Sequence, residues 1–444
     1  MKVLVTASLL LSASLIVVAC SSSQDGNASS DPSDDPTTAV AIAAKGAGIH
    51  ANDVVDADTG FDTGTNGAST QGAKDEAGDR FGSVASFEDG AGPILMAGSC
   101  SCCHACSAGV SAQAAQFTQS TQQGYCVTAS PITESRAGHF NGVNFVDHPG
   151  GSLIQDRAND RAIQEHILPG NEVQTLRLTN SIAGDGFVEA IDSNTLAAIA
   201  AAQPAGQRGT VIQVPVAEAG GALRAGRFGW KNQHASLLSY AAESYVNEIG
   251  ITNRLFPTEN TSNGTNVQGG PFDGKADPVG TGEDDGNDID QFTLLMRSMK
   301  APPRGPINAS VTNGETQFNS IGCATCHVGT ITTAPAGTVI NGGAFTVPAA
   351  LGDKNIHPFS DYLLHDVGTG DGIVQNGGQG TRNQLRTAPL WGIGARTRFM
   401  HDGASFTVLQ AIQRHAGQAT TATNNFNALS AVNQSDVLAF IFSL

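Results

Sequence analysis

Basic residues are scarce in this sequence. Lys and Arg number 23 against 40 Asp and Glu, which gives a formal net charge of −17 at pH 7. Proteins that bind the phosphate backbone of nucleic acids or anionic lipid gather an excess of cations on the binding face. The charge balance therefore argues against nucleic acid as a partner and against binding to an anionic lipid surface.

Apolar runs long enough to cross a bilayer are also lacking. The apolar run over residues 3–18 follows Lys2 and is too short and too early for a mature membrane span. It ends in Val17-Val18-Ala19-Cys20, which resembles the bacterial lipobox. We therefore expect a lipoprotein signal peptide over 1–19 and a body tethered by lipid at the bacterial cell envelope, in the periplasm or at the outer membrane. Ordinary cleavage that leaves Cys20 unmodified is the alternative.

Charged residues are few in this sequence, whereas glycine is abundant. Charged residues make up 14% of the chain, and glycine occurs 53 times. This combination favours long irregular connections around a compact core. Residues 20–86 have no sustained apolar period and are rich in Ser, Gly and Asp, so we expect a disordered linker there.

The eight cysteines include one clean motif, Cys323-Ala324-Thr325-Cys326-His327. Two cysteines with two residues between them lie about one helical turn apart, on the same side of a helix. A histidine directly after the second cysteine completes the pattern for covalent attachment of c-type haem, with the imidazole as an iron ligand. A chance match or a zinc half-site is the alternative, and zinc requires further Cys or His side chains nearby.

A second, less regular copy is Cys100-Ser101-Cys102-Cys103-His104. Cys106 follows closely, so a thiolate metal cluster is the alternative. We favour haem, because the exported chain meets an oxidising compartment and the other motif is clean. The sequence thus predicts two covalently bound haem c groups, held by Cys100, Cys103 and His104 and by Cys323, Cys326 and His327.

Three cysteines remain once haem and lipid are assigned, namely Cys102, Cys106 and Cys126. Two of them can form a disulfide in an oxidising compartment. We expect Cys106 to pair with Cys126 and Cys102 to be free, although connectivity does not follow from sequence alone.

Most of the elements that can be recognised are helices. Apolar periods at 235–249 and 433–444 predict amphipathic helices, and 289–299 also looks helical. We therefore expect a mainly α fold with two cytochrome c-like haem domains and long irregular loops. A Pro-rich hinge near 301–306 suggests an N-terminal haem domain over 87–305 and a C-terminal cytochrome c-like domain over 306–444.

An acidic run precedes this expected boundary, from Glu283 to Asp288. Acidic and amide side chains at such spacing can bind calcium, which leaves open a calcium ion between the domains. A solvated acidic loop is the other interpretation.

Several runs together resemble the bacterial di-haem cytochrome c peroxidase superfamily. More closely, they resemble its di-haem oxidoreductase branch, whose members are described as peroxidases or thiol oxidoreductases. The runs occur in family order within 92–444. They are 150–157, 227–231, 247–252, the second CxxCH, 361–368, 386–392 and 400–403.

The resemblance implies one electron-transfer haem and one peroxide-reacting haem. The C-terminal haem on His327 would pass electrons, and the position of the family's distal methionine is here His415. We therefore expect bis-histidine ligation by His327 and His415, with Met400 as the other candidate ligand. The haem on His104 would meet peroxide. Candidates for a distal histidine that leaves on activation are His139, His148 and His166.

The resemblance also implies two catalytic residues. Trp230 matches the tryptophan between the haems and would relay electrons, while Glu248 matches the glutamate over the open iron face. A glutamate there can carry a proton between the peroxide oxygens. We therefore expect a peroxidase that takes electrons from a small redox carrier and reduces hydrogen peroxide. A di-haem electron carrier, or haem-dependent oxidation of thiols or another organic substrate, is the alternative.

Overall fold

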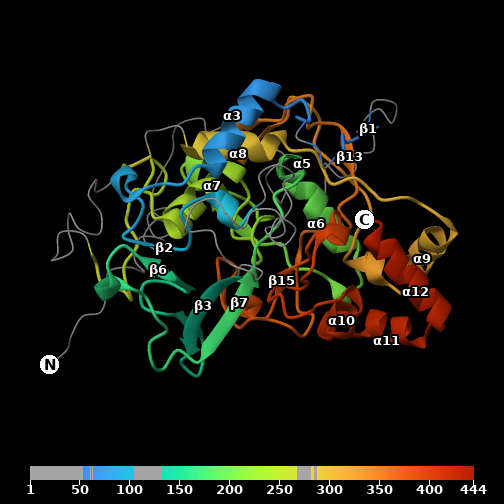
Figure 1. The fold of residues 1–444 in the computed structure, drawn as a ribbon. Coiled ribbons are helices and arrows are strands. Elements are labelled where there is room, and N and C mark those ends of the chain that lie inside the picture. Colours follow the sequence, from blue (N-terminus) through green and yellow to red (C-terminus); the bar gives the residue numbers. More distant parts are fainter. Residues whose placement is uncertain (1–53, 61, 63, 105–132, 268–281, 285–287) are drawn as a thin grey trace, which may run out of the picture. The chain divides into compact units, whose positions relative to one another are not determined.

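The computed structural model describes residues 54–60, 62, 64–104, 133–267, 282–284 and 288–444 (Figure 1). These residues belong to one compact unit, Asp31–Leu444. The expected signal peptide, Cys20, Cys106 and Cys126 lie outside the described residues. No helix among the residues that the structure describes is long and apolar enough to cross a membrane.

The fold is mixed, since 35% of the described residues are helical and 17% are strand. The expectations of a mainly α fold and of two cytochrome c-like haem domains are not confirmed. The helices are α3 (Gln71–Gly82), α5 (Asp185–Glu189), α6 (Ser193–Ala202), α7 (Leu237–Ser244), α8 (Asp288–Ser298), α9 (Ala309–Ser320), α10 (Val408–Gln413), α11 (Thr420–Ala428) and α12 (Ala431–Phe442). The longer strands are β3 (Thr133–Phe140), β4 (Phe145–Asp147), β7 (Val173–Leu178), β8 (Gln213–Val216), β9 (Ala222–Ala225) and β13 (Lys354–Ile356). Two-residue strands are β1 (Val55–Asp56), β2 (Ile94–Leu95), β5 (Leu153–Ile154), β6 (Arg157–Ala158), β10 (Ile331–Thr332), β11 (Val339–Ile340), β12 (Phe345–Thr346), β14 (Leu364–His365) and β15 (Leu385–Arg386).

The largest sheet is built around β3, which pairs with β4, β5 and β7. All three pairings are antiparallel, and the β3–β7 register runs from Thr133 opposite Leu178 to Gly138 opposite Val173. Figure 1 shows β3 and β7 side by side. The strand β3 has no apolar alternation, since its even positions Glu134 and Arg136 are charged and form an ion pair. This is why no strand was expected there.

The end of the expected linker is folded. Strand β1 pairs in parallel with β13, and α3 packs against α8. The helix α3 is capped by the Thr70 side chain and buries Ala77 and Phe81. The prediction of disorder is therefore wrong for this part of 20–86, because a few buried side chains suffice to hold a short helix that shows no sustained apolar period.

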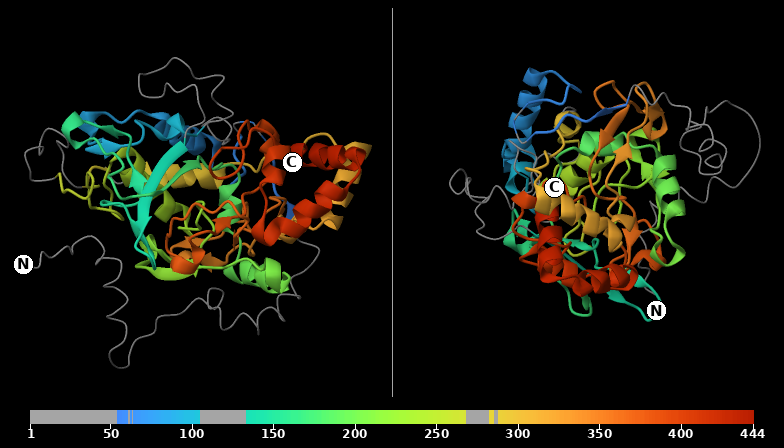
Figure 2. Two further views of the ribbon diagram at one scale, coloured as in Figure 1. Left: turned by 90° about the horizontal axis from the view of Figure 1, so that it is seen from below. Right: turned by 90° about the vertical axis from the view of Figure 1, so that its right-hand side faces the viewer.

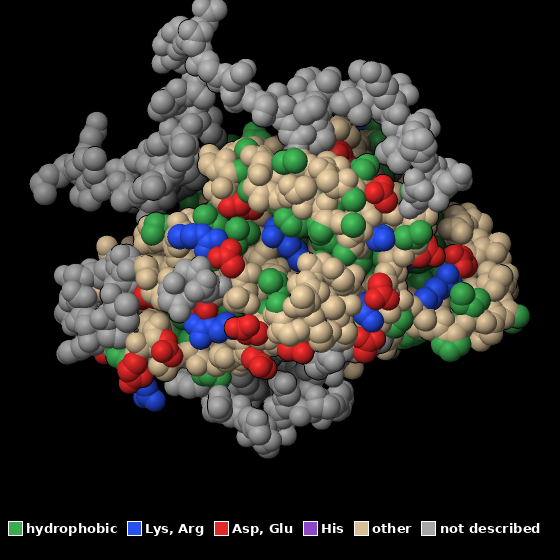
Figure 3. Space-filling view, turned by 90° about the horizontal axis from the view of Figure 1, so that it is seen from above, with side chains coloured by type: hydrophobic (Ala, Val, Ile, Leu, Met, Phe, Trp, Pro, Cys, Tyr) green, Lys and Arg blue, Asp and Glu red, His purple; other side chains and the backbone are tan. Residues whose placement is uncertain are grey.

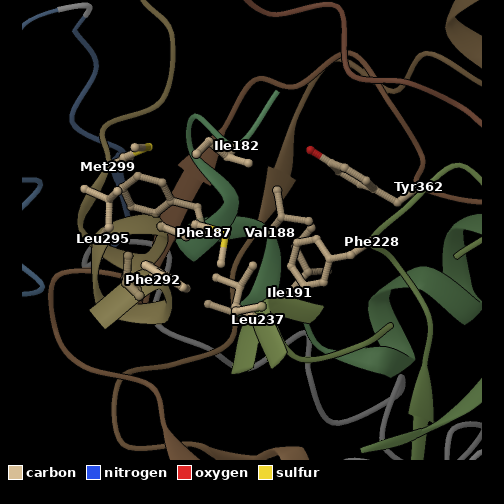
Figure 4. Packing of buried hydrophobic residues seen from close by; sticks show 14 of the residues in the cluster. Ile182, Phe187, Val188, Ile191, Phe228, Leu237, Phe292, Leu295, Met299 and Tyr362 are labelled. Carbon is tan, nitrogen blue, oxygen red and sulfur yellow. The ribbon is translucent and has the colours of Figure 1, made fainter. Parts of the chain in front are cut away.

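One hydrophobic core joins residues from both sides of the expected domain boundary (Figure 4). Phe187, Phe228 and Phe292 come from the N-terminal side, and Tyr362 and Trp391 come from the C-terminal side. On the face shown in Figure 3, Lys and Arg side chains are interspersed with Asp and Glu. That face therefore carries no block of a single charge among its described residues.

The helices α9 and α12 lie side by side (Figures 1 and 2). They approach most closely at Gly314. A Cβ atom at Gly314 would overlap the carbonyl oxygen of Asp436 and lie 2.7 Å from Cβ of Phe440. Phe318, Phe426 and Phe440 form the core behind this contact. The approach of the two helices positions the segment that leads into Cys323.

We expect Gly314→Ala to destabilise the protein by about 1–3 kcal/mol, the usual cost of overpacking a tight contact. Urea denaturation of the two proteins measures the difference. Gly72→Ala in α3 is the control, since nothing lies within 4 Å of a Cβ atom at that position. Equal stability of Gly314→Ala and the parent protein would contradict the close approach.

Candidate functional site

The second CxxCH motif lies in a short 3-10 turn, Cys323–Thr325, directly after α9. Gly322 has φ of +97°, which lets the chain turn sharply between the helix and the motif. The Nδ1 atom of His327 lies 2.8 Å from the carbonyl oxygen of Phe359 and donates to it. This bond leaves Nε2 available as a metal ligand, and burial lowers the pKa of His327 to about 4, so the ring is neutral.

His415 lies across the same cavity. Its Nδ1 atom donates to the carbonyl oxygen of Ala411 at 2.7 Å, and burial lowers its pKa. The cavity has about 1350 Å³ of empty space, including its solvent-open part, and Cys323, Cys326, His327, His415 and Met400 all line it. The structure thus brings together the side chains expected to hold the second haem, with both candidate distal ligands present.

These residues fit a haem. The cavity walls are mostly apolar, with Phe318, Leu390 and Ile412 among the lining residues. Neither cysteine forms a disulfide, so both are available to bond a haem, and burial raises the pKa of each thiol to about 12. An apolar cavity with two neutral imidazoles suits a flat macrocycle with an iron at its centre.

A buried acid–histidine pair lies beside this motif. Nε2 of His365 is 2.8 Å from Oδ2 of Asp361, and Nδ1 is 3.7 Å from Sγ of Cys326. Gln203 donates to the same Asp361 oxygen and to the carbonyl oxygen of Thr325. The ligand atoms of Cys326, Asp361 and His365 lie within 4.8 Å of one another, so this trio is the metal-binding alternative.

The first CxxCH motif also forms a 3-10 turn, Cys100–Cys102. Cys102 is disulfide-bonded, so the expectation that it is free is wrong, whereas Cys100 and Cys103 form no disulfide. A disulfide at Cys102 removes one ligand from the alternative thiolate cluster and leaves the two cysteines that a haem requires. Sequence spacing could not reveal this pairing, since connectivity depends on the fold.

His104 packs edge-on against Phe81, with ring centroids 6.0 Å apart. Its Nδ1 atom is buried and has no hydrogen-bond partner among the described atoms. Burial lowers the pKa of His104 to about 4, so this imidazole is also neutral and able to bind a metal. The residues of this motif therefore fit a haem as well.

Glu248 lies next to the first motif. It is part of a π-helical turn, Tyr245–Ile249, which continues α7, and such turns are frequent at functional sites. Its carbonyl oxygen accepts hydrogen bonds from the backbone N–H groups of Met96 and Ala97, at 2.7 and 3.0 Å, just ahead of Cys100. Burial and then the charge of Glu248 raise the pKa of the Cys103 thiol.

The carboxyl group of Glu248 is poised for proton transfer. Burial, followed by the charge of Glu134, raises its pKa to about 7, and Arg136 partly offsets this. A carboxyl group with a pKa near neutrality can both take and give a proton in the physiological range. Glu134 and Arg136 on β3 were not expected at the site, because nothing in the sequence links them to Glu248.

Trp230 lines the cavity of His327. Its Nε1 atom donates to the carbonyl oxygen of Leu178 at 2.7 Å, and its ring meets His401 edge-on at 6.2 Å. Its own carbonyl oxygen accepts from the backbone N–H of Arg386. The structure therefore brings Trp230 to the second motif and Glu248 to the first.

A buried ion network lies next to both partners of the hydrogen bond between Trp230 and Leu178. Arg177 precedes Leu178 in the chain, and Lys231 follows Trp230. Both cations pair with Asp371, at 2.7 and 2.9 Å. The three side chains are at most 1% exposed. Lys231 also donates to the carbonyl oxygens of Thr381, Arg382 and Gln384. Sequence reasoning missed this network, because Asp371 is far away in the chain.

The three candidate distal histidines of the first haem differ in their surroundings. His139 lies three residues after Arg136 on β3, so its side chain points to the opposite face of the sheet. His148 is buried, and its Nε2 atom accepts from the backbone N–H of Leu168 at 3.1 Å. His166 is exposed. The structure brings none of these rings into a described hydrogen bond with the first motif.

The acids proposed for calcium are engaged with protein groups. Oε2 of Glu283 accepts from the N–H and the hydroxyl of Thr252, and Asp284 accepts from the N–H of Asp288. Asp288 pairs with Arg80. These bonds favour a structural role for the described acids, and positions 285–287 lie outside the described residues.

The solved structures that are similar to this chain include the following two. Hydrazine synthase of Kuenenia stuttgartiensis, pressurized with xenon, has 13% identity and a TM-score of 0.31 over 61% of this chain and 73% of that chain. A MauG-like protein associated with microbial copper homeostasis has 18% identity and a TM-score of 0.23 over 38% of this chain and 62% of that chain. Neither score is high enough to carry an argument. No curated protein matches the chain.

Most of the chain matches one protein family. The family described as "Di-haem oxidoreductase, putative peroxidase" matches residues 139–444. Trp230, Glu248, the second CxxCH motif and His415 lie within the match, and the first motif precedes it. Membership implies haem cofactors and an oxidoreductase role. The chain belongs to the di-haem oxidoreductase family.

Proposed function

We propose that this protein is a c-type di-haem peroxidase that reduces hydrogen peroxide. Cys100 and Cys103 would hold one haem and Cys323 and Cys326 the other, by thioether bonds. His104 and His327 would be the proximal ligands. The observation that carries the proposal is the position of Glu248 beside the first motif, with a pKa of about 7.

When bound, the haem irons supply the electrons for cleavage of the peroxide O–O bond. Glu248 takes the proton from one peroxide oxygen and gives it to the leaving oxygen, which departs as water. Its raised pKa suits both steps, because the same carboxyl group must accept and then release a proton. Arg136, which pairs with Glu134, limits how far the pKa of Glu248 rises.

Trp230 would pass electrons from the second haem toward the first. Its indole lines the cavity of His327 and donates a hydrogen bond to Leu178. Arg386 holds the backbone here, because its side chain donates to the carbonyl oxygen of Gly229 and its N–H donates to that of Trp230. A relay residue must keep a constant position, since electron transfer depends steeply on separation. The hydrogen bonds around Trp230 provide that rigidity.

His415 is the proposed distal ligand of the second haem. We expect His415→Met to keep a six-coordinate iron and to raise its reduction potential, because methionine stabilises the ferrous state relative to imidazole. A redox titration followed by absorption measures the shift. His357→Met is the control, since His357 is a partly exposed surface side chain near Asp56. An unchanged potential in His415→Met would exclude His415 as the ligand.

A small redox carrier is the proposed electron donor, with hydrogen peroxide as the substrate. The acidic net charge suits a basic carrier steered by charge. We further propose that Cys20 is lipidated and holds the protein at the bacterial cell envelope. The lipobox-like sequence Val17-Val18-Ala19-Cys20 supports this placement.

The experiment that tests the proposed function is peroxide turnover by purified holo-protein with a chemically reduced donor, followed by absorption spectroscopy. We expect a high-spin or switchable haem and steady consumption of peroxide. Two low-spin haems that do not react with peroxide would favour a di-haem electron carrier instead.

A further inference from the structure

Tyr245 is a buried phenol that the proposed peroxide chemistry does not use. It is 6% exposed and begins the π-helical turn that carries Glu248. Its hydroxyl donates to Oδ2 of Asp288 at 2.5 Å. Asp288 is 3% exposed, and both of its carboxylate oxygens accept from the guanidinium group of Arg80. The phenol is thus in direct contact with a carboxylate that can take its proton.

A continuous path of packed rings joins Tyr245 to the first motif. The ring of Tyr245 meets Phe292 at 5.1 Å, Phe292 meets Phe81 at 5.7 Å, and Phe81 meets His104 at 6.0 Å. The contacts are edge-on, the geometry that aromatic pairs prefer in a tightly packed core.

A pocket open to solvent reaches the same group of residues. Tyr245, Cys100, Phe81 and Phe292 line it together with Arg80 and Asp288. Three more acidic side chains, Glu88, Asp89 and Glu283, also line the pocket. Aromatic walls in acidic surroundings suit a small aromatic reductant without negative charge, such as a hydroquinone. The second haem would occupy a different cavity, which His327 and Trp230 line.

We propose that Tyr245 is an oxidisable relay through which a small aromatic reductant supplies electrons to the first haem site. The proposal rests on the peroxidase function and adds a second route for electrons. Reduction of hydrogen peroxide to two waters takes two electrons and two protons. Tyr245 supplies one of these electrons as its O–H bond breaks, and the proton moves to Oδ2 of Asp288. The other electron would come from the second haem by way of Trp230, and water supplies the two protons that the peroxide takes up. The reductant then returns one electron and one proton to the phenol oxygen, and Asp288 releases its proton to water.

The test is rapid-freeze electron paramagnetic resonance of diferric holo-protein mixed with hydrogen peroxide in the absence of a donor. We expect a tyrosyl radical in the wild-type protein and its loss in Tyr245→Phe. Tyr240→Phe is the matched control, because Tyr240 is partly buried on the same helix and stacks on Phe228 and His234. The chain has only 4 Tyr and 2 Trp, which makes the radical straightforward to assign.

Asp288→Asn tests the proton acceptor separately. It keeps an oxygen that can accept the phenol hydrogen bond but cannot take the proton. We expect radical formation to slow by at least about tenfold, since positioned bases contribute about 10²–10⁴-fold. Hydroquinone is expected to quench the radical in the wild-type protein.

Each outcome decides one of the two proposals. An equal radical yield in Tyr245→Phe, or a wild-type protein that reacts with peroxide and forms no tyrosyl radical, would refute the relay and leave the peroxidase function intact. A haem spectrum that peroxide does not change would refute the peroxidase function, and the relay with it.

Discussion

Replacing Glu248 by glutamine is expected to lower peroxide turnover by about 10²–10⁴-fold, the usual contribution of a positioned acid–base group. Glutamine keeps the shape of the side chain but cannot take a proton from peroxide. Steady-state peroxide consumption by holo-proteins with equal haem content measures the loss. The backbone bonds from Met96 and Ala97 to the carbonyl oxygen of residue 248 are unaffected, so the first motif should keep its position.

The pH profile provides a second readout for the same variant. Burial and Glu134 raise the pKa of Glu248 to about 7, so below this pH the carboxyl group is protonated and cannot act as a base. Wild-type turnover should therefore rise as the pH increases through about 7, and Glu248→Gln should lose that dependence. Glu315→Gln is the control, because Glu315 and Arg304 form a partly exposed surface pair. Equal rates in Glu248→Gln and the wild type would remove Glu248 from the mechanism.

Asp371→Asn is expected to destabilise the protein by about 3–5 kcal/mol, the range for breaking a buried ion pair. The substitution leaves the guanidinium group of Arg177 and the ammonium group of Lys231 buried without their shared counter-charge. Urea denaturation at neutral pH measures the change in the free energy of unfolding. Because Lys231 follows Trp230 directly, we also expect slower electron transfer between the haems in the fraction that folds.

Asp290→Asn is the matched control for this prediction. Asp290 also pairs with an arginine, Arg254, but both side chains are nearly half exposed, and such pairs contribute about 0–1 kcal/mol. A similar small change in both variants would contradict the importance of the buried network.

The pH dependence of Asp371 follows from its surroundings. Burial alone would raise its pKa, but Arg177 and Lys231 outweigh burial and hold the pKa below its usual value. A carboxyl group with a lowered folded-state pKa stabilises the protein above its unfolded-state pKa. The contribution is therefore fully present at neutral pH and is lost as the pH falls through the folded-state pKa.

Local patterns predicted much of the helical structure. The helix expected over 235–249 is α7 with its π-helical continuation, 289–299 corresponds to α8, and 433–444 corresponds to α12 within two residues. Apolar periodicity was strong in these segments, because each buries one face against the core. The CxxCH spacings and the family runs also predicted the di-haem oxidoreductase family, which residues 139–444 match.

Features that depend on distant residues could not be predicted in this way. The strand β3 pairs its polar sequence with β7, about forty residues further on, and carries Glu134 and Arg136 to Glu248. The ion network of Arg177, Lys231 and Asp371 joins segments far apart in the chain. In both cases the tertiary fold determines which side chains meet. Neither the apolar periodicity nor the spacing of motifs in the sequence indicates these pairs.

The central claim is that both CxxCH motifs hold haem through thioether bonds. Intact-protein mass spectrometry, after maturation in a host that attaches c-type haem, tests it most directly. The account predicts a mass increase of two haems, reduced to one in Cys100→Ala/Cys103→Ala and likewise in Cys323→Ala/Cys326→Ala. A colourless product without added mass, or one haem that survives both double substitutions, would contradict it.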